Sequence, residues 1–237
     1  MSPDSAASGR LSTRPSGPGQ IPASPGVHAL SLDGARDAYL YFPAGWRPDR
    51  PAPLALILHG AGQNGRDFLE AWREPADRSG AVLVAPDSRG RTWDVLLGGF
   101  GPDVHFLDRA LAAAFSRCAV DTAHLAVEGF SDGASYALSL GTGNGDLFTH
   151  IIANSPGFMR PPVQVGRPLI YLDHGTDDRI LPIDRCSRRL APALERAGYD
   201  VTYEEFDGGH RLPSTIAARS FEWWLSTSTQ DSGLRTA

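Results

Sequence analysis

Short apolar runs alternate along this chain with segments that carry one apolar stripe at helical spacing. Such runs are typical of strands buried on both faces of a sheet, and such stripes are typical of helices that cover it. The alternation therefore predicts an α/β fold with a mostly parallel central sheet and helices on both faces. The expected strands are Leu54–His59, Ala81–Ala85, His124–Phe130, His150–Asn154, Leu169–His174 and Val201–Phe206, and the expected helices are Arg66–Arg78, Asp103–Arg117, Ser131–Leu140, Asp184–Ala197 and Ser214–Leu225.

Short local signals indicate where some elements turn, begin or end. His28–Leu32 and Arg36–Phe42 flank Asp33-Gly34, a dipeptide that supplies the positive φ angles of a type I′ turn. An N-terminal antiparallel hairpin is therefore expected ahead of the parallel strands. Asp103 is a candidate N-cap for the helix that it opens, and Gly198 stands where a C-capping glycine is expected.

The two ends of the chain differ in composition from its middle. Residues 1–26 are rich in Ser, Pro and Gly with few apolar side chains to bury, so a flexible tail is expected there. Residues 27–228 are expected to form one domain, and residues 229–237 a second flexible tail. The first segment lacks the apolar core of a secretory signal, and no window reaches the roughly 18 apolar residues of a membrane helix. A cytoplasmic protein without a membrane span is the resulting expectation.

Charge and cysteine usage exclude several classes of function. The net charge is 22 − 27 = −5, and all 22 basic residues are arginines. Without lysine, the chain has no Schiff-base chemistry, no phosphate-loop lysine and no Ser–Lys dyad. No basic stripe points to nucleic acid as a partner. Cys118 and Cys186 lack metal-site spacing, so we expect two buried thiols and neither a metal nor an organic cofactor.

One motif at a strand–helix junction indicates a nucleophile. Gly129-Phe130-Ser131-Asp132-Gly133 joins an expected strand to an expected helix, and the chain contains no other GxSxG. On so sharp a turn the serine hydroxyl stands clear of the sheet, and only glycine fits two residues to either side. The following helix also directs its N-terminal amides toward developing negative charge. Ser131 is therefore the candidate nucleophile.

A serine nucleophile needs a base that an acid orients. One later strand ends in the segment HGTDDRILP, which contains Asp177 and Asp178, and the next ends in DGGH, which contains His210. Both segments fall at carboxyl ends of parallel strands, the edge where such sheets bind ligands. Only one of the two aspartates can face His210, and the residues alone leave that choice open. The chain order Ser, Asp, His is that of α/β-hydrolases.

The first parallel strand ends in a glycine-flanked loop, Gly60-Ala61-Gly62-Gln63-Asn64. Its backbone N–H groups, together with the N–H of Asp132, are expected to form an oxyanion hole above Ser131. His59 precedes these donors and is expected to brace the loop.

HGAGQNG, GFSDG, HGTDDRILP and DGGH together resemble the phospholipase/carboxylesterase group of α/β-hydrolases, related to polyhydroxybutyrate-depolymerase-like and feruloyl-esterase-like serine esterases. The likeness covers roughly residues 35 to 227. It implies an α/β-hydrolase fold, Ser131 as nucleophile, His210 as base and Asp178 as acid. It also implies that Ala61 and Asp132 supply the oxyanion N–H groups. Asp132 departs from the glutamine usual in acyl-protein-thioesterase-like members.

The expected activity is hydrolysis of small-molecule carboxylic esters through an acyl-enzyme. No insertion is long enough to form a large lid, so short-to-medium acyl or aryl esters are the expected substrates. Arg89 and Arg91 are candidates to contact an acidic substrate group, although a surface role is favoured for both. A serine peptidase, an acyltransferase and a non-catalytic binding protein are the alternatives. Five apolar side chains on strand-end loops are the candidate pocket: Trp93, Leu96, Phe130, Phe158 and Leu181.

Overall fold

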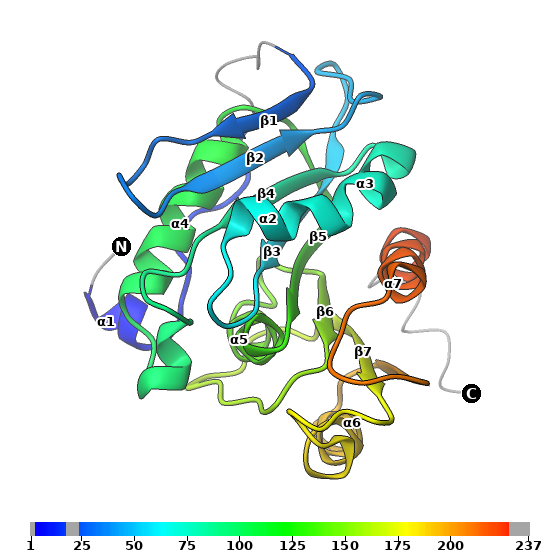
Figure 1. Ribbon diagram of the computed structural model, residues 1–237. Coiled ribbons are helices and arrows are strands. Elements are labelled where there is room, and N and C mark those ends of the chain that lie inside the picture. Colours follow the sequence, from blue (N-terminus) through cyan, green and yellow to red (C-terminus); the bar gives the residue numbers. More distant parts are fainter. Residues whose placement is uncertain (1–2, 18–23, 228–237) are drawn as a thin grey trace.

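The computed structural model describes residues 3–17 and 24–227. Within these residues, the chain forms an eight-stranded sheet of order β1-β2-β4-β3-β5-β6-β7-β8 (Figure 1). The first two strands are antiparallel to their neighbours and all other pairs are parallel. The strands are β1 (Gly26–Ala29), β2 (Ala38–Phe42), β3 (Ala52–Leu58), β4 (Val82–Pro86), β5 (Val120–Phe130), β6 (His150–Asn154), β7 (Leu169–Gly175) and β8 (Val201–Phe206).

Helices cover both faces of this sheet. One core joins a sheet face to α4 (Pro102–Phe115), α5 (Asp132–Gly143) and α6 (Ser187–Arg196). The other core joins the opposite face to α2 (Gly65–Leu69), α3 (Arg73–Ser79) and α7 (Ser214–Ser226) (Figure 1). The predicted α/β architecture is therefore confirmed. The remaining helical segments are α1 (Pro3–Ala7) and the 3₁₀ turns η1 (Glu70–Trp72), η2 (Asp94–Leu97) and η3 (Ile183–Arg185).

The six predicted parallel strands are all present. Five of them bury side chains on both faces, whereas the edge strand β8 is partly exposed. Every residue of β4, β6 and β7 is buried. The helix predicted from Arg66 to Arg78 is instead broken into α2, η1 and α3. Pro75 lies in the first turn of α3, and its missing N–H prevents a continuous helical ladder there. Gly198 takes a φ of +85° two residues after the end of α6, where a helix-terminating glycine is expected.

The predicted type I′ turn at Asp33-Gly34 is wrong. The register pairs Ala29 with Tyr39, and the connection between β1 and β2 is correspondingly longer. Positive φ is found at Ser31 and not at Gly34. The Asp37 carboxylate accepts hydrogen bonds from the N–H groups of Ser31 and Leu32, and these contacts shape the turn.

The sequence predicts Asp103 as the N-cap of α4, and this prediction is wrong. Gly101 and Pro102 begin the helix, and the buried Asp103 carboxylate accepts the N–H groups of Arg89 and Asp94. The side chain therefore fixes the long loop between β4 and α4. This loop carries Trp93 toward the carboxyl ends of the strands.

Residues 3–17 are not a flexible tail, so this part of the domain prediction is wrong. Leu11 is buried in the core, and its N–H donates to the Asn144 side chain at 2.8 Å. Arg10 forms a bidentate ion pair with Asp146, both bonds 2.8 Å long. The segment is thus held by specific polar contacts, which composition does not reveal. The rest of the predicted tail, residues 18–23, and the predicted tail at 229–237 lie outside the described residues.

Two smaller predictions are also tested by the fold. Cys118 and Cys186 are buried and free, as expected for structural thiols. None of the helices within residues 3–17 and 24–227 combines the length and apolar character that a membrane crossing requires.

Candidate active site

Ser131 occupies a strained turn between β5 and α5. Its backbone has φ 58° and ψ −116°, a combination that non-glycine residues rarely adopt and that is found mostly at functional sites. The Ser131 N–H donates to the backbone oxygen of Asn154 at 2.9 Å, which anchors the turn on β6. The hydroxyl is thereby raised above the carboxyl edge of the sheet.

The two glycines of the motif are required by backbone contacts. A Cβ on Gly129 would lie 2.2 Å from the Gly133 oxygen, and a Cβ on Gly133 would lie 2.0 Å from the Leu58 oxygen. Neither backbone atom can move without opening the junction of β3 and β5 with α5. Both positions therefore require glycine, as the sequence predicts.

His210 lies within hydrogen-bond distance of both Ser131 and Asp178. Its Nε2 is 2.7 Å from Ser131 Oγ, and its Nδ1 is 2.6 Å from Asp178 Oδ2. Asp178 follows β7, and His210 follows β8. The loop that carries His210 approaches β7 closely, since a Cβ on Gly175 would lie 2.4 Å from the Gly208 oxygen. The structure thus brings together the three residues predicted for the triad.

Asp178 is held as a carboxylate acceptor by its own loop. Its Oδ1 accepts the N–H groups of Ile180 and Leu181, each at 2.8 Å. Burial by itself would raise the pKa of Asp178, but the Leu181 N–H and the His210 ring outweigh it and leave the pKa below its ordinary value. Asp177 is exposed, and its N–H donates to the Gly208 oxygen. Of the two candidate acids, therefore, Asp178 is the one placed against His210.

His174 packs beside the acid without facing the serine. It is fully buried, and its Nε2 lies 2.7 Å from the Leu181 oxygen and 3.2 Å from Asp178 Oδ2. Its Nδ1 lies 2.7 Å from the Ser187 hydroxyl. Burial lowers the pKa of His174, which favours a neutral ring that donates to the Leu181 oxygen. His174 thus supports the loop that carries Asp178.

The loop after β3 places Ala61 beside Ser131, as the sequence predicted. Gly60, Ala61 and Ser131 line one cavity, and Asp132 begins α5 directly after the serine. Among the described residues, the N–H groups of Ala61 and Asp132 donate to no protein acceptor. The Asp132 carboxylate is turned aside, where it accepts the Thr92 hydroxyl at 2.6 Å. Both N–H groups remain available to an oxyanion.

His59 and Trp93 support this loop from beneath. The His59 Nδ1–H donates to the Gly60 oxygen at 2.7 Å, while its Nε2 accepts the Ser88 N–H at 3.0 Å. The Trp93 indole N–H donates to the His59 backbone oxygen at 2.8 Å, and the two rings lie 4.9 Å apart. Burial lowers the pKa of His59, consistent with a neutral structural ring.

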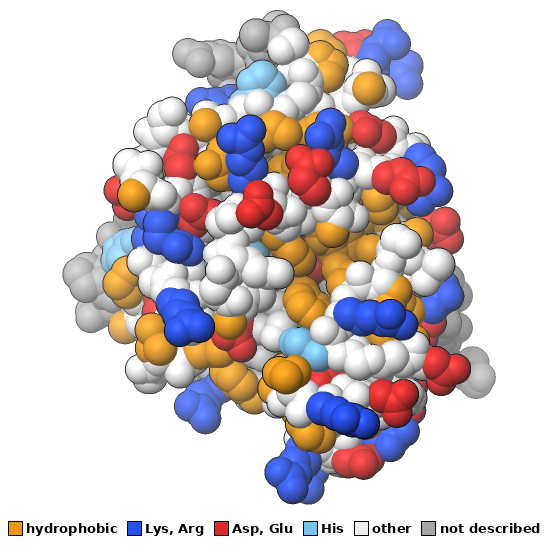
Figure 2. All heavy atoms as spheres, in the orientation of Figure 1, with side chains coloured by type: hydrophobic (Ala, Val, Ile, Leu, Met, Phe, Trp, Pro, Cys, Tyr) orange, Lys and Arg blue, Asp and Glu red, His pale blue; other side chains and the backbone are white. Residues whose placement is uncertain are grey.

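A cavity of about 280 Å³ opens beside the serine. A second hollow of about 420 Å³ shares Gln63 and Phe130 with it. Figure 2 shows apolar side chains lining a hollow in this face, next to a histidine. The cavity is lined by Gly60, Ala61, Gln63, Phe130, Ser131, Ile180 and His210, and the second hollow by Gly62, Gln63, Asn64, Asp67, Phe68, Ala71, Phe130 and Leu212.

Of the five predicted pocket residues, Phe130 lines both of these hollows and the other four line neither. Trp93 is fully buried, because its ring packs between His59 and Tyr136. Leu96 and Phe158 pack against the core on the α5 side of the sheet. Leu181 turns toward Gly157. The exposed Ile180 and the half-buried Leu212 line the site and were missed.

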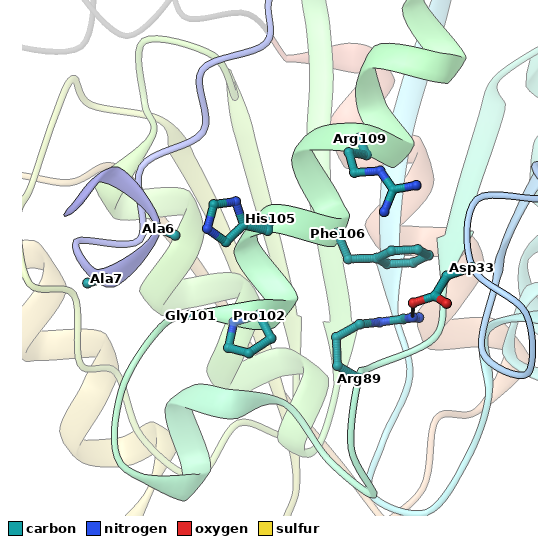
Figure 3. Close-up of a pocket in the computed structure, with 9 residues that line it drawn as sticks. All are labelled: Ala6, Ala7, Asp33, Arg89, Gly101, Pro102, His105, Phe106 and Arg109. Atoms are coloured by element: carbon teal, nitrogen blue, oxygen red, sulfur yellow. Dashed lines mark hydrogen bonds and ion pairs between the residues drawn. The ribbon is translucent and has the colours of Figure 1, made fainter. Parts of the chain in front are cut away.

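Arg89 does not lie beside Ser131, where it could contact an acidic group of the substrate. Its guanidinium stacks on Phe106 at 3.4 Å and pairs with Asp33 at 2.8 Å, beside a separate hollow of about 500 Å³ (Figure 3). That hollow lies along the first turns of α4 and contains none of the triad residues. The arginine therefore ties the β1–β2 connection to α4 and does not face Ser131.

Sequence comparison finds relatives of limited coverage. A poly(3-hydroxybutyrate) depolymerase from Ralstonia pickettii is 29% identical over 164 residues, which cover 59% of this chain and 33% of that protein. A putative esterase, NocK, from Nocardia uniformis subsp. tsuyamanensis is 28% identical over 153 residues, 60% of this chain and 44% of that protein. The matched region is thus less than half the length of these relatives. No protein-family model matches the sequence.

Comparison with solved structures identifies the fold. A thermostable esterase superposes with a TM-score of 0.70 at 20% identity, over 85% of this chain and 63% of that one. The chain has the α/β-hydrolase fold and is similar to esterases of that fold. In an α/β-hydrolase, the nucleophile elbow and its partners lie at the carboxyl edge of the sheet. Ser131, Asp178 and His210 lie at this edge here.

Proposed function

We propose that this protein is a serine carboxylesterase that hydrolyses carboxylic esters through an acyl-enzyme intermediate. The observation that carries the proposal is the position of His210, within hydrogen-bond distance of Ser131 Oγ on one side and Asp178 on the other. This arrangement is what nucleophilic catalysis by serine requires. The esterase and depolymerase names of the sequence relatives support the same chemistry.

In the first half of the reaction, Ser131 Oγ attacks the ester carbonyl carbon while His210 Nε2 accepts its proton. Asp178 holds the Nδ1–H of His210, which fixes the tautomer and stabilises the imidazolium. The carbonyl oxygen becomes an oxyanion that the N–H groups of Ala61 and Asp132 stabilise. His210 then returns the proton to the leaving alcohol, and the acyl group stays on Ser131.

In the second half, a water molecule takes the place of the alcohol. His210 accepts a proton from this water as it attacks the acyl-enzyme, and the same two N–H groups stabilise the new oxyanion. Collapse of the intermediate returns the proton to Ser131 Oγ and releases the carboxylic acid. Asp178 remains ionised throughout, as its lowered pKa favours.

The proposed substrates are short-to-medium acyl or aryl esters. The cavity beside Ser131, about 280 Å³, is small, and the adjoining hollow has Phe68, Phe130 and Leu212 in its lining. Such a site suits a small apolar group that leaves the carbonyl over the serine. A small-molecule ester is therefore the proposed partner of this site.

The proposal is tested by covalent labelling and by a substrate panel. A fluorophosphonate probe is expected to label the protein, with the adduct on the peptide that contains Ser131. p-Nitrophenyl esters of increasing acyl length, methyl ferulate, a lysophospholipid and a polyester film then define the substrate range. A protein that takes up no label and hydrolyses none of these esters is not a serine esterase.

Shortening Leu212 to alanine is expected to change acyl-chain preference. The adjoining hollow loses apolar contact area, so kcat/KM for a medium-chain p-nitrophenyl ester should fall about tenfold while that for the acetate changes little. Leu225→Ala, on α7 beside a different hollow, is the matched control and should preserve the ratio. An equal loss on both esters would show that the hollow does not hold the acyl chain.

A further inference from the structure

A buried polar group lies directly beneath the nucleophile and takes no part in the mechanism above. Asn154 ends β6, and the sheet register sets it beside Asp173 on β7. Both side chains are fully buried, and they project from the sheet face that α7 covers. Glu128, on β5, is buried in the same group and contacts the Asn154 amide at 2.6 Å.

The hydrogen bonds of Asn154 fix which way its amide points. Its Nδ2 donates to Glu128 Oε1 at 2.6 Å and to the Gly129 backbone oxygen at 3.2 Å. A flipped amide would set its oxygen against that carbonyl, so this orientation is the favourable one. Both amide hydrogens are then used. The buried Asn154 Oδ1 accepts no hydrogen bond from residues 3–17 or 24–227.

The buried carboxyl group of Asp173 also lacks hydrogen-bond donors. Neither of its carboxyl oxygens receives a hydrogen bond from the described residues. An ionised Asp173 would therefore place two unsatisfied acceptors beside the unsatisfied acceptor of Asn154, at a cost in desolvation and in repulsion. One hydrogen placed between the two side chains gives the Asn154 oxygen a donor and removes the charge of Asp173.

We propose that Asp173 is protonated in the folded protein and that its carboxyl O–H donates to Oδ1 of Asn154. The bond extends a chain of hydrogen bonds from Asp173 through Asn154 to Glu128. Folding then takes up one proton from solvent at pH values where the unfolded aspartate is ionised.

The groups that face Asp173 favour the neutral acid. Burial and, second, the charge of Glu204 on β8 raise the pKa of Asp173 well above its ordinary value, and Arg219 on α7 only partly opposes them. Arg219 pairs with Glu204, which also accepts the Tyr171 hydroxyl. Glu128 adds no positive charge, and burial raises its pKa as well. Arg219, the cation that acts on Asp173, is thus engaged by another carboxylate.

This proton acts on the nucleophile through the backbone. The Asn154 oxygen accepts the Ser131 N–H at 2.9 Å, and the Asp173 oxygen accepts the Ser155 N–H at 2.9 Å. Joining the two side chains therefore holds the ends of β6 and β7 together under the strained serine. Asp173 and Asn154 are positioning residues in this view, a role that rests on the proposed function, whereas the proton itself does not.

Infrared difference spectroscopy tests the proton directly. The spectrum of the wild type minus that of Asp173→Asn, at pH 8, is expected to contain the C=O band of a protonated carboxyl group. Asp49→Asn, at an exposed aspartate, should give only a carboxylate difference. A carboxylate band for Asp173 would overturn the proposal and would indicate an ionised side chain bound to water or to a cation.

The pH dependence of stability provides a second test. Because the raised pKa makes the folded state bind one extra proton, the unfolding constant of the wild type should rise about tenfold per pH unit relative to that of Asp173→Asn above the unfolded pKa of ~4. This rise should stop above the folded pKa. Asp173→Asn should lose one proton from this slope, and Asp49→Asn should retain it. An unchanged slope in Asp173→Asn would contradict the proposal.

The positioning role is tested by kinetics. Asp173→Asn keeps a hydrogen-bond donor for Asn154, whereas Asp173→Leu does not. We expect kcat of the leucine variant to be roughly tenfold below that of the asparagine variant with similar KM, the size of effect expected for one lost positioning contact. Equal kcat values would remove the positioning role. Since labelling of Ser131 tests the proposed function separately, the two failures can be distinguished.

Discussion

Replacing Ser131 by alanine is expected to lower kcat for ester hydrolysis by about 10⁶-fold, the loss found when a serine nucleophile of this type is removed. Alanine cannot form the acyl-enzyme, and His210 is left without the hydroxyl that lies 2.7 Å from its Nε2. Initial rates on a p-nitrophenyl ester measure the effect. Labelling by a fluorophosphonate should be lost as well.

The fold should survive this substitution. Alanine keeps the Cβ of serine, so the positive φ at position 131 costs no more than before, and the N–H bond to Asn154 remains. Thermal unfolding followed by circular dichroism should therefore change little. Ser116→Ala, at the exposed end of α4, is the matched control and should keep full activity. Appreciable hydrolysis by the Ser131 variant would mean that another group is the nucleophile.

The strands and the GxSxG turn could be predicted because each depends on a short run of consecutive residues. A strand buried on both faces requires a largely apolar run, and the fully buried β6 begins and ends where the sequence placed it. The partly exposed edge strand β8 also has its predicted bounds. The glycines at 129 and 133 are required by backbone contacts that no other residue permits. Local sequence therefore carries this information without reference to the rest of the fold.

The pocket could not be predicted in the same way. Trp93 is on a strand-end loop, as expected of a pocket residue. However, the Asp103 carboxylate accepts a backbone N–H of that loop, and the indole N–H donates to the His59 backbone oxygen. Whether a loop side chain faces the ligand or the core depends on partners distant in sequence. The same holds for Leu11, whose buried position depends on Asn144. Composition counts apolar residues but does not identify such contacts.

The choice of Asp178 over Asp177 as the acid could be predicted only in part. The sequence places Asp177 and Asp178 in one loop, and residue type does not distinguish them. The difference is set by the hydrogen bonds of Asp178 to Ile180 and Leu181, which turn its carboxylate toward His210. The turn that orients the carboxylate is local in sequence. The partner that this carboxylate faces, His210, follows β8 and is therefore distant in sequence.

Asp178→Asn is expected to lower kcat about 10⁴-fold, the loss known for amide replacement of the orienting acid in such a triad. The amide can still bond to His210, but it favours the tautomer that leaves a hydrogen on Nε2. That nitrogen then cannot accept the Ser131 proton. The measurement is kcat on a p-nitrophenyl ester across pH, with KM expected to change much less because substrate contacts are untouched.

Asp177→Asn is the matched control, one residue away and of the same chemistry. Its side chain is exposed and its backbone N–H, which the substitution keeps, bonds to Gly208. Activity should stay within about threefold of the wild type, as expected for a substitution of an exposed side chain that makes no contact with the triad. The reverse pattern, with activity lost on changing Asp177 and kept on changing Asp178, would show that the loop rearranges in the working enzyme. An equal loss in both variants would instead assign the effect to the net charge beside His210.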